Sequence, residues 1–137
     1  MIISIDFDGT VVRHEYPNVG ADVPGAVDNL RWLVDQGHEL VLYTMRSRKY
    51  LEHAIDWFKN RGIPLAGIQY APGQSDWTSS NKCYANIYIG DDALGAPLIY
   101  PENGAPYFDW ETAYLELTKR LSGPVPNPII RKEKGAI

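Results

Sequence analysis

In the stretch IISIDFDGT, residues 2–10, an apolar run comes directly before two aspartates that are separated by a single residue. A glycine and a threonine follow. Residues 2–5 lack a clean alternation of polar and apolar side chains, which is typical of a short strand covered on both faces of a parallel sheet. Strand interiors disfavour Asp and Gly, so the strand is expected to end at Ile5. Because neighbouring carboxylates repel each other, residues 6–10 are either an acidic turn or part of a site that uses both charges.

Short apolar runs alternate with segments of helical spacing along the rest of the chain. We expect strands at 40–43, 67–70, 86–89 and 98–100, and helices at 24–36, 47–61 and 109–121. Asp109 is suited to cap the last of these helices. Alternating strands and helices are typical of an α/β fold with a parallel sheet. The sequence therefore predicts a single Rossmann-like domain with three layers, α/β/α, around a mainly parallel five-stranded sheet.

Composition narrows the classes of protein. The 137 residues carry a formal net charge of −4 and a single cysteine, Cys83. This charge argues against stable nucleic-acid binding, which calls for a basic surface. The first residues do not resemble a signal peptide and no apolar run is long enough to cross a membrane, so we expect a cytoplasmic protein without membrane contact. The domain is predicted over residues 1–122, and residues 123–137, with three prolines, are predicted to form a Pro-rich C-terminal tail.

Polar side chains gather at one edge of the predicted sheet. In open parallel sheets, ligands bind at the carboxyl ends of the strands. The polar residues that follow or closely precede the expected strands are Asp6, Asp8, Thr44, Lys82, Asp91 and Asp92. Two like charges about 4 Å apart cost roughly 4 kcal/mol at an effective dielectric near 20, so a divalent cation such as Mg²⁺ or a protonated carboxyl is expected among them. Without the cation, neutralising Asp91 or Asp8 should raise the melting temperature.

Residues 6–10 resemble the D-x-D-G-T signature of the haloacid dehalogenase-like (HAD) superfamily of phosphohydrolases. Thr44 and Lys82 match the second and third motifs of that superfamily, and residues 90–92 match the fourth, all in the same order. One helix and one strand nearly fill each span between these motifs. The chain is therefore similar to the small members of the superfamily, which have no sizeable cap domain.

The resemblance implies a Mg²⁺-dependent phosphomonoester hydrolase that works through an aspartyl-phosphate intermediate. Asp6 would be the nucleophile and Asp8 the general acid and base. Their spacing of two residues places both side chains on one side of an extended segment. Thr44 would donate a hydrogen bond to a phosphoryl oxygen, and Lys82 would neutralise charge on the phosphoryl group. The substrate would be a phosphorylated molecule that the sequence does not identify.

The same resemblance implies which residues hold the ligands. Mg²⁺ would be held by Asp6, the backbone carbonyl of Asp8, Asp91 and, through water, Asp92. The glycine of the signature permits a sharp turn that brings backbone N–H groups near a phosphate. The residues expected to bind substrate are Gly9, Thr10, Thr44, Arg46 and Lys82.

Several of these residues also have simpler interpretations. Lys82 fits an ordinary surface lysine, with Lys49 as a substitute at the phosphate. Arg46 and Arg48 fit solvated charges at the start of a helix, where the helix dipole disfavours cations slightly. Trp77 would either stack on a substrate ring or pack within the protein. The three histidines show no ligand spacing and are expected to be surface or packing residues.

The alternative function is a non-hydrolytic phospho-acceptor, or a phosphate-binding α/β module. Receiver-type modules need an acceptor Asp at the end of the third strand, whereas the run at 67–70 is followed by Ala-Pro-Gly. A P-loop nucleotide binder is excluded because the sequence has no G-x-x-x-x-G-K-[ST]. A homo-oligomer is compatible with the composition.

Overall fold

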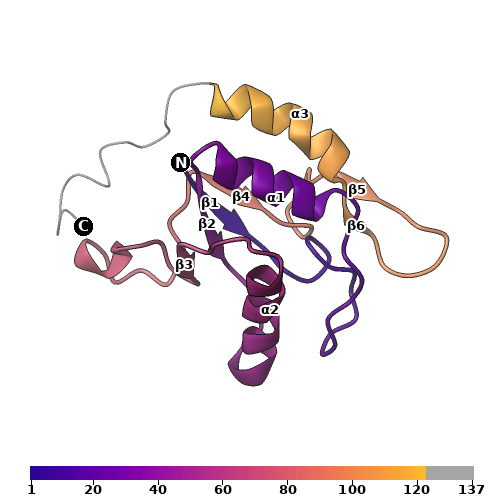
Figure 1. The fold of residues 1–137 in the computed structure, drawn as a ribbon, viewed down its shortest axis with the longest axis horizontal. Helices are drawn as coiled ribbons and strands as arrows, with labels where there is room; N and C mark the ends of the chain where they lie inside the picture. The colour runs from indigo at the N-terminus through magenta and orange to yellow at the C-terminus, as the bar shows by residue number, and fades with distance from the viewer. Residues whose placement is uncertain (123–137) are drawn as a thin grey trace.

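The computed structural model describes residues 1–122, so the predicted tail at 123–137 lies outside the described residues. The helices are α1 (Ala26–Asp35), α2 (Arg48–Asn60) and α3 (Trp110–Leu121), with a short 3-10 helix η1 (Gln74–Asp76) between the strands. The strands are β1 (Ile2–Ile5), β2 (Glu39–Leu42), β3 (Gly67–Ile68), β4 (Ile87–Ile89), β5 (Leu98–Ile99) and β6 (Tyr107–Phe108). Figure 1 shows these elements along the chain.

The main sheet has four strands in the order β3-β2-β1-β4, and all neighbours are parallel. The α/β class and the Rossmann-like arrangement agree with the prediction, but the five-stranded sheet was wrong. Instead, β5 pairs antiparallel with β6, Leu98 opposite Phe108, in a separate two-stranded sheet. Pro97 and Pro101 flank β5, and proline offers no N–H to a sheet ladder, which confines the strand to this short pair.

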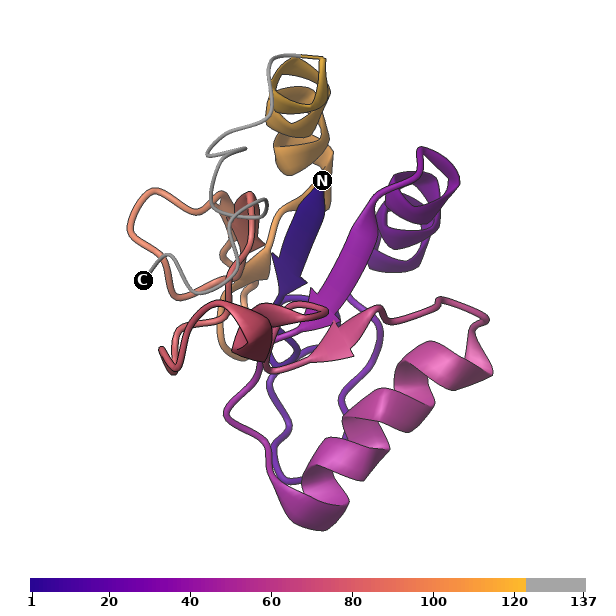
Figure 2. The ribbon, with the colours of Figure 1, turned by 90° about the vertical axis from the view of Figure 1, so that its left-hand side faces the viewer.

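All three helices cover the same face of the main sheet. Ile3 and Ile5 of β1 belong to one buried cluster that also holds Leu30 of α1, Phe58 of α2 and Leu117 of α3. The opposite face carries only a small buried cluster, formed by Ile2, Val41, Ala71 and Cys83. Figure 2 shows the helices on one side of the strands and the segment around η1 on the other. The predicted third layer therefore consists of irregular chain with one short 3-10 helix.

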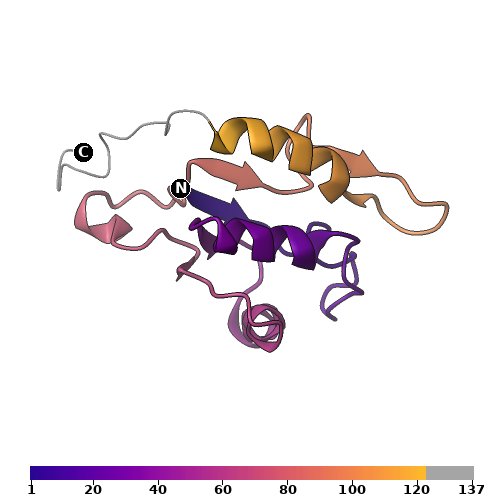
Figure 3. The ribbon, with the colours of Figure 1, turned by 45° about the horizontal axis from the view of Figure 1, so that its top comes forward.

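Helix α3 fixes the carboxyl edge of the sheet. Its N-cap is Asp109, as predicted, and the carboxylate accepts a hydrogen bond of 3.1 Å from the backbone N–H of Thr112. The indole Nε1 of the buried Trp110 donates to the carbonyl of Thr10 at 2.8 Å. In Figure 3, α3 runs alongside β4. The last helix is thus tied directly to the D-x-D-G-T segment.

The second face of the sheet stays open toward the carboxyl ends of the strands. Tyr43, just beyond β2, and Tyr88 of β4 are both exposed there. The open face therefore leaves aromatic side chains next to the edge where the predicted site lies.

Among residues 1–122, no helix is both long and apolar enough to cross a membrane.

Candidate functional site

Asp6 lies at the carboxyl end of β1, in the middle of the sheet. Its backbone N–H donates to the carbonyl of Ile89 at 3.0 Å, which continues the pairing of β1 with β4. The residue faces a cavity of about 320 Å³ on the open side of the sheet. Thr44 and Asp92 line the same cavity. Three of the predicted site residues therefore meet at one opening, as the argument from strand ends requires.

The carboxylates of Asp6 and Asp91 lie side by side around the hydroxyl of Thr10. The buried Thr10 donates from Oγ1 to Asp6 Oδ2 at 2.9 Å, with Asp91 Oδ1 at 3.4 Å, and accepts from the backbone N–H of Asp91 at 3.1 Å. This hydroxyl is committed to orienting the two acids. Thr10 is therefore a positioning residue here; it does not line the cavity of Asp6, and its contact with substrate stays a prediction.

Burial and the neighbouring Asp91 together raise the pKa of Asp6 to about 8. The largest cause is the loss of water around the carboxyl, which disfavours its charged form. The hydrogen bond to Asp91 and the charge of Asp91 act in the same direction, while hydrogen bonds from Thr10 and from the Phe7 backbone oppose it. Asp6 and Asp91 form one close pair within the group of four carboxylates that the sequence placed at this edge.

Gly9 is required where the chain bends around this pair. It has a φ of 80°, and a Cβ at this position would collide with His14 Nε2 and Asp91 Oδ2. The backbone N–H of Gly9 donates to the carbonyl of Val12 at 2.7 Å, so it is not directed at a ligand. The structure gives Gly9 a place in close packing, and its role in phosphate binding stays a prediction.

Sequence reasoning missed His14. Its ring nitrogen Nε2 lies 2.8 Å from Asp91 Oδ2, and its side chain is half-exposed. The residue belongs to the loop 13–22, whose base is closed by the backbone hydrogen bond from Arg13 to Ala21. Figure 1 shows this loop projecting from the carboxyl edge of the sheet. No spacing signal marks His14, because the loop fold alone brings it to the acid pair.

Asp8 is held in a very different environment from Asp6. Arg46 donates from Nε to Asp8 Oδ2 and from Nη2 to Asp8 Oδ1, each at 2.7 Å. The Arg46 side chain is 1% exposed, so this is a buried, bidentate ion pair. The guanidinium of Arg46 is used within the protein in this arrangement, and its contact with substrate stays a prediction.

Each remaining N–H of the Arg46 guanidinium also has an acceptor. Nη1 donates to the carbonyls of Pro17 and Tyr50 at 3.3 Å each, and Nη2 donates to the carbonyl of Asn18 at 2.8 Å. Two of these carbonyls belong to loop 13–22. Arg46 therefore ties the D-x-D-G-T segment, the loop and the start of α2 into one unit.

Thr44 is fixed by a residue that the sequence did not single out. The backbone N–H of Thr44 donates to Gln69 Oε1 at 2.9 Å, and Gln69 Nε2 donates to the carbonyl of Thr44 at 2.6 Å. The Thr44 hydroxyl accepts from the backbone N–H of Arg46 at 3.1 Å. A hydroxyl in this position keeps its own proton for a ligand in the cavity. Thr44 and Asp6 line the same cavity, and the hydrogen bond from Thr44 to a phosphoryl oxygen stays a prediction.

Of the remaining residues that the sequence singled out, Asp92 lines the cavity of Asp6, whereas Lys82 and Trp77 do not. Asp92 is exposed at the cavity, whereas Lys82 is not among the residues that line it. The Lys82 Nζ lies 5.4 Å from the centroid of the Tyr88 ring, on the open face. Trp77 packs edge-on against Tyr84 at 5.6 Å between ring centroids and is absent from the cavity of Asp6. The packing interpretation of Trp77 therefore holds.

The donors present suit a hard cation. Within residues 1–122, no group of three or more His, Cys, Asp or Glu side chains is arranged to hold a metal ion. Mg²⁺, however, typically uses only one or two carboxylates and completes its shell with water and substrate phosphate. The close pair of Asp6 and Asp91, with the raised pKa of Asp6, is such a set of oxygen donors, and His14 contacts one oxygen of Asp91.

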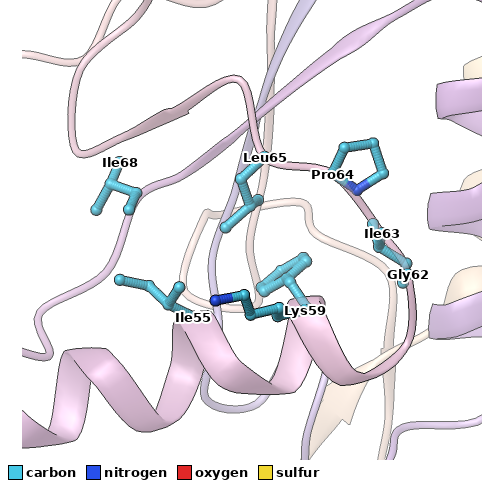
Figure 4. A pocket seen from close by; sticks show the side chains of 8 residues that line it. Ile55, Lys59, Gly62, Ile63, Pro64, Leu65 and Ile68 are labelled. Atoms are coloured by element: carbon cyan, nitrogen blue, oxygen red, sulfur yellow. The ribbon is translucent and has the colours of Figure 1, made fainter.

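A larger cavity, of about 550 Å³, lies away from this site. Figure 4 shows its lining from α2 and the chain that leads into β3, including Ile55, Lys59 and Ile68. Its side chains are apolar apart from Lys59, and none of the predicted site residues contributes. Size alone would favour this cavity, but its lining offers neither a nucleophile nor an acid. The smaller cavity beside Asp6 is the better candidate for chemistry.

Comparison with known proteins places the fold. No protein family matches the sequence, and no curated protein matches it. The solved structure of a conserved protein from Bacteroides thetaiotaomicron is 32% identical, covers 88% of this chain and 91% of its own, and superposes with a TM-score of 0.73. The chain belongs to the same family as that protein. The family supports the α/β fold along nearly the whole described chain.

Proposed function

We propose that this protein is a Mg²⁺-dependent phosphomonoester hydrolase of the HAD type, with Asp6 as the nucleophile. The observation that carries the proposal is the pairing of Asp6 with Asp91 at the carboxyl end of the central strand, next to an open cavity. Such a pair is costly for a purely structural site, because the charged form of Asp6 is disfavoured. A site in which the ionised form of Asp6 is unfavourable without a ligand is suited to bind a cation and a reacting group.

The chemistry proceeds in two displacements on the chain's own carboxylate. An oxygen of Asp6 forms a bond to phosphorus while the bond from phosphorus to the ester oxygen breaks, and the ester oxygen leaves with the electron pair. Water then attacks the phosphorus of the aspartyl-phosphate, the bond from phosphorus to the Asp6 oxygen breaks, and the proton that water loses is balanced through solvent by the proton that the released ester oxygen takes up. Thr44 donates a hydrogen bond from its hydroxyl to a phosphoryl oxygen. When bound, Mg²⁺ would be held by Asp6 and Asp91 and would supply positive charge to the phosphoryl oxygens.

Asp8 limits how the leaving group is protonated. A general acid must reach the ester oxygen, whereas both carboxylate oxygens of Asp8 accept from Arg46 and Asp8 does not line the cavity. Asp8 is therefore not directed at the ester oxygen while Arg46 holds it. Proton donation by Asp8 would require the Arg46 contact to open, together with the carbonyls of loop 13–22 that share it.

The test is hydrolysis of 4-nitrophenyl phosphate. The purified chain should release 4-nitrophenol with Mg²⁺ and lose the activity with EDTA. Asp6→Asn keeps the shape of the side chain but removes the nucleophile, so its kcat should fall at least about a thousandfold. Asp76→Asn, which changes an exposed aspartate outside this cavity, is the matched control and should retain activity. Full activity of Asp6→Asn would disprove the proposal.

The alternative, a non-hydrolytic phospho-acceptor, makes a different prediction for the same protein. A phospho-acceptor would retain a stable aspartyl-phosphate after incubation with acetyl phosphate and release phosphate slowly. Mass spectrometry of the intact chain, with Asp6→Asn as the comparison, separates the two functions. A lasting gain of one phosphoryl group without turnover would favour the acceptor.

A further inference from the structure

The pairing register builds a trough on the open face of the sheet. Ser4 and Asp6 project from the same face of β1 because they are two residues apart. Ser4 pairs with Tyr88 of β4 and with Val41 of β2. Tyr43, two residues after Val41, therefore stands on the same face beside Asp6. We call this cavity the tyrosine trough: Ser4 forms its floor, Tyr43 and Tyr88 its walls, and Asp6 its end.

One wall of the tyrosine trough is rigid. The Tyr88 hydroxyl donates to the carbonyl of Cys83 at 2.6 Å and accepts from the backbone N–H of Ala85 at 3.2 Å. The Lys82 ammonium lies over the same ring. A ring held at its hydroxyl loses little freedom when a ligand packs against it, so binding there costs little conformational entropy.

The size and lining of the trough define its occupant. A volume of about 320 Å³ is at the lower end of small-molecule sites, so it suits one ring with its phosphate. Met45, Ile89 and Ala93 complete an apolar lining, and the polar groups gather at the end where Asp6, Thr44 and Asp92 lie. Aromatic walls favour an aromatic ligand, because ring pairs gain stability beyond the area they bury. An apolar ring in the trough would leave its phosphate at Asp6.

The Asp8–Arg46 ion pair points to the same class of substrate. An alkoxide leaves slowly without a proton, whereas a phenolate is a far weaker base and departs without one. Asp8 does not line the trough, and both of its carboxylate oxygens accept from Arg46, so this geometry is matched to a phenolic ester oxygen that leaves without a proton from Asp8. We infer that the substrate is an aryl phosphate, the phosphate monoester of a phenolic ring, whose ring lies in the tyrosine trough. This inference rests on the proposed hydrolase function.

The experiment fills the floor of the trough and measures substrate preference. We compare kcat/KM for phenyl phosphate and for propyl phosphate in the wild type, Ser4→Val and Ser4→Ala. Valine is favourable in a strand but adds two carbons to the floor, so the ratio of the two kcat/KM values should fall about tenfold. Ser4→Ala leaves the floor open and should keep the ratio within about twofold. An unchanged ratio in Ser4→Val would overturn the inference.

A wall substitution covers the case in which Ser4→Val does not fold. Tyr43→Leu removes one aromatic wall at an exposed position and should lower the same ratio about fivefold. Tyr100→Leu changes an exposed tyrosine outside the trough and should not alter the ratio. Free phosphotyrosine and a phosphotyrosine peptide then distinguish a small aryl ester from a side chain, and a preference for either over propyl phosphate that falls in Tyr43→Leu supports the aryl class.

Binding of phosphonates separates failure of this inference from failure of the hydrolase proposal. Phenylphosphonate and methylphosphonate cannot be hydrolysed, and NMR of the tyrosine rings reports their binding. If no ester is hydrolysed but phenylphosphonate binds about tenfold more tightly than methylphosphonate, and Ser4→Val abolishes the difference, the trough stands without the hydrolase. Equal binding of both overturns the trough. A dimer in sedimentation that Met45→Asp dissociates, with no aryl preference, would make a second copy the occupant and also overturn it.

Discussion

Two aspartates two residues apart, Asp6 and Asp8, occupy opposite electrostatic environments. Asp8 has a buried guanidinium on both carboxylate oxygens, and that guanidinium has no donor left over. Asp6 has a second carboxylate beside it, and its pKa is raised to about 8. Among the described residues, Asp8 is paired with a buried guanidinium, whereas Asp6 has no ion pair and its neighbour Asp91 contacts His14. This difference holds Asp8 in a contact within the protein and leaves Asp6 facing the open cavity.

The largest change in the free energy of unfolding is expected when the ion pair between Asp8 and Arg46 is removed. Asp8→Asn leaves the buried guanidinium of Arg46 without its counter-charge, which should lower the free energy of unfolding by about 3–5 kcal/mol. Asp22→Asn is the matched control, because the Asp22–Arg61 pair is partly exposed and should cost under about 1 kcal/mol. Urea unfolding at pH 7 measures both. The Arg46 contact reverses the sign that the sequence predicted for Asp8, and an increase in stability would show that the pair is not formed.

A smaller effect of opposite sign is expected at the uncompensated charge. In the metal-free protein, Asp91→Asn removes the carboxylate that disfavours ionised Asp6 and should stabilise the fold by about 1–2 kcal/mol at pH 8. A pKa raised to about 8 in the folded state gives stability that is present below pH 4 and is lost as the pH rises through 8. The gain of Asp91→Asn should therefore vanish toward pH 4. Thermal unfolding from pH 4 to 9 measures it, and a gain that does not depend on pH would contradict the coupling.

The smallest effect comes from supplying the missing positive charge. Mg²⁺ at about five times its Kd should stabilise the wild type by about 1 kcal/mol at pH 8. The gain should be lost at pH 5, where Asp6 is protonated, and in Asp91→Asn, which lacks one of the donors. Asp8→Asn leaves the carboxylates of Asp6 and Asp91 unchanged, so the folded molecules of this variant should still bind Mg²⁺. Calorimetry should show Mg²⁺ binding to the wild type and to Asp8→Asn, and weaker binding to Asp91→Asn.

Local patterns predicted the fold where each element depends on its own residues. The apolar run at β1 ends at Ile5, as expected, and Asp109 caps α3. The fifth strand failed because a strand needs a partner, and the partner of β5 is the short β6, which no sequence pattern marked. The placement of all three helices on one face of the sheet could not be predicted either. Periodicity identifies the apolar face of each helix, but it does not show on which face of the sheet that helix packs.

The site was predicted in part for the same reason. Motif positions after strands brought Asp6, Thr44 and Asp92 to one cavity. The partner of Asp8 could not be predicted, because Arg46 precedes an expected helix and its side chain turns inward only when loop 13–22 folds around it. His14 reaches Asp91 through that same loop. Long-range side-chain pairing depends on the loop conformation, which the local sequence does not determine.

The hydrogen bond from Trp110 to Thr10 has a spectroscopic consequence. A second indole, Trp57 Nε1, donates to Asp22 Oδ1 at 2.8 Å, so an indole marks each end of the segment that runs from residue 10 to residue 22. Indole emission shifts with the polarity around the ring, and these two rings lie in the buried cluster beneath that segment. Replacing Trp32 and Trp77 by phenylalanine would leave two intrinsic reporters. Their emission would then follow release of the segment in real time, without an added label.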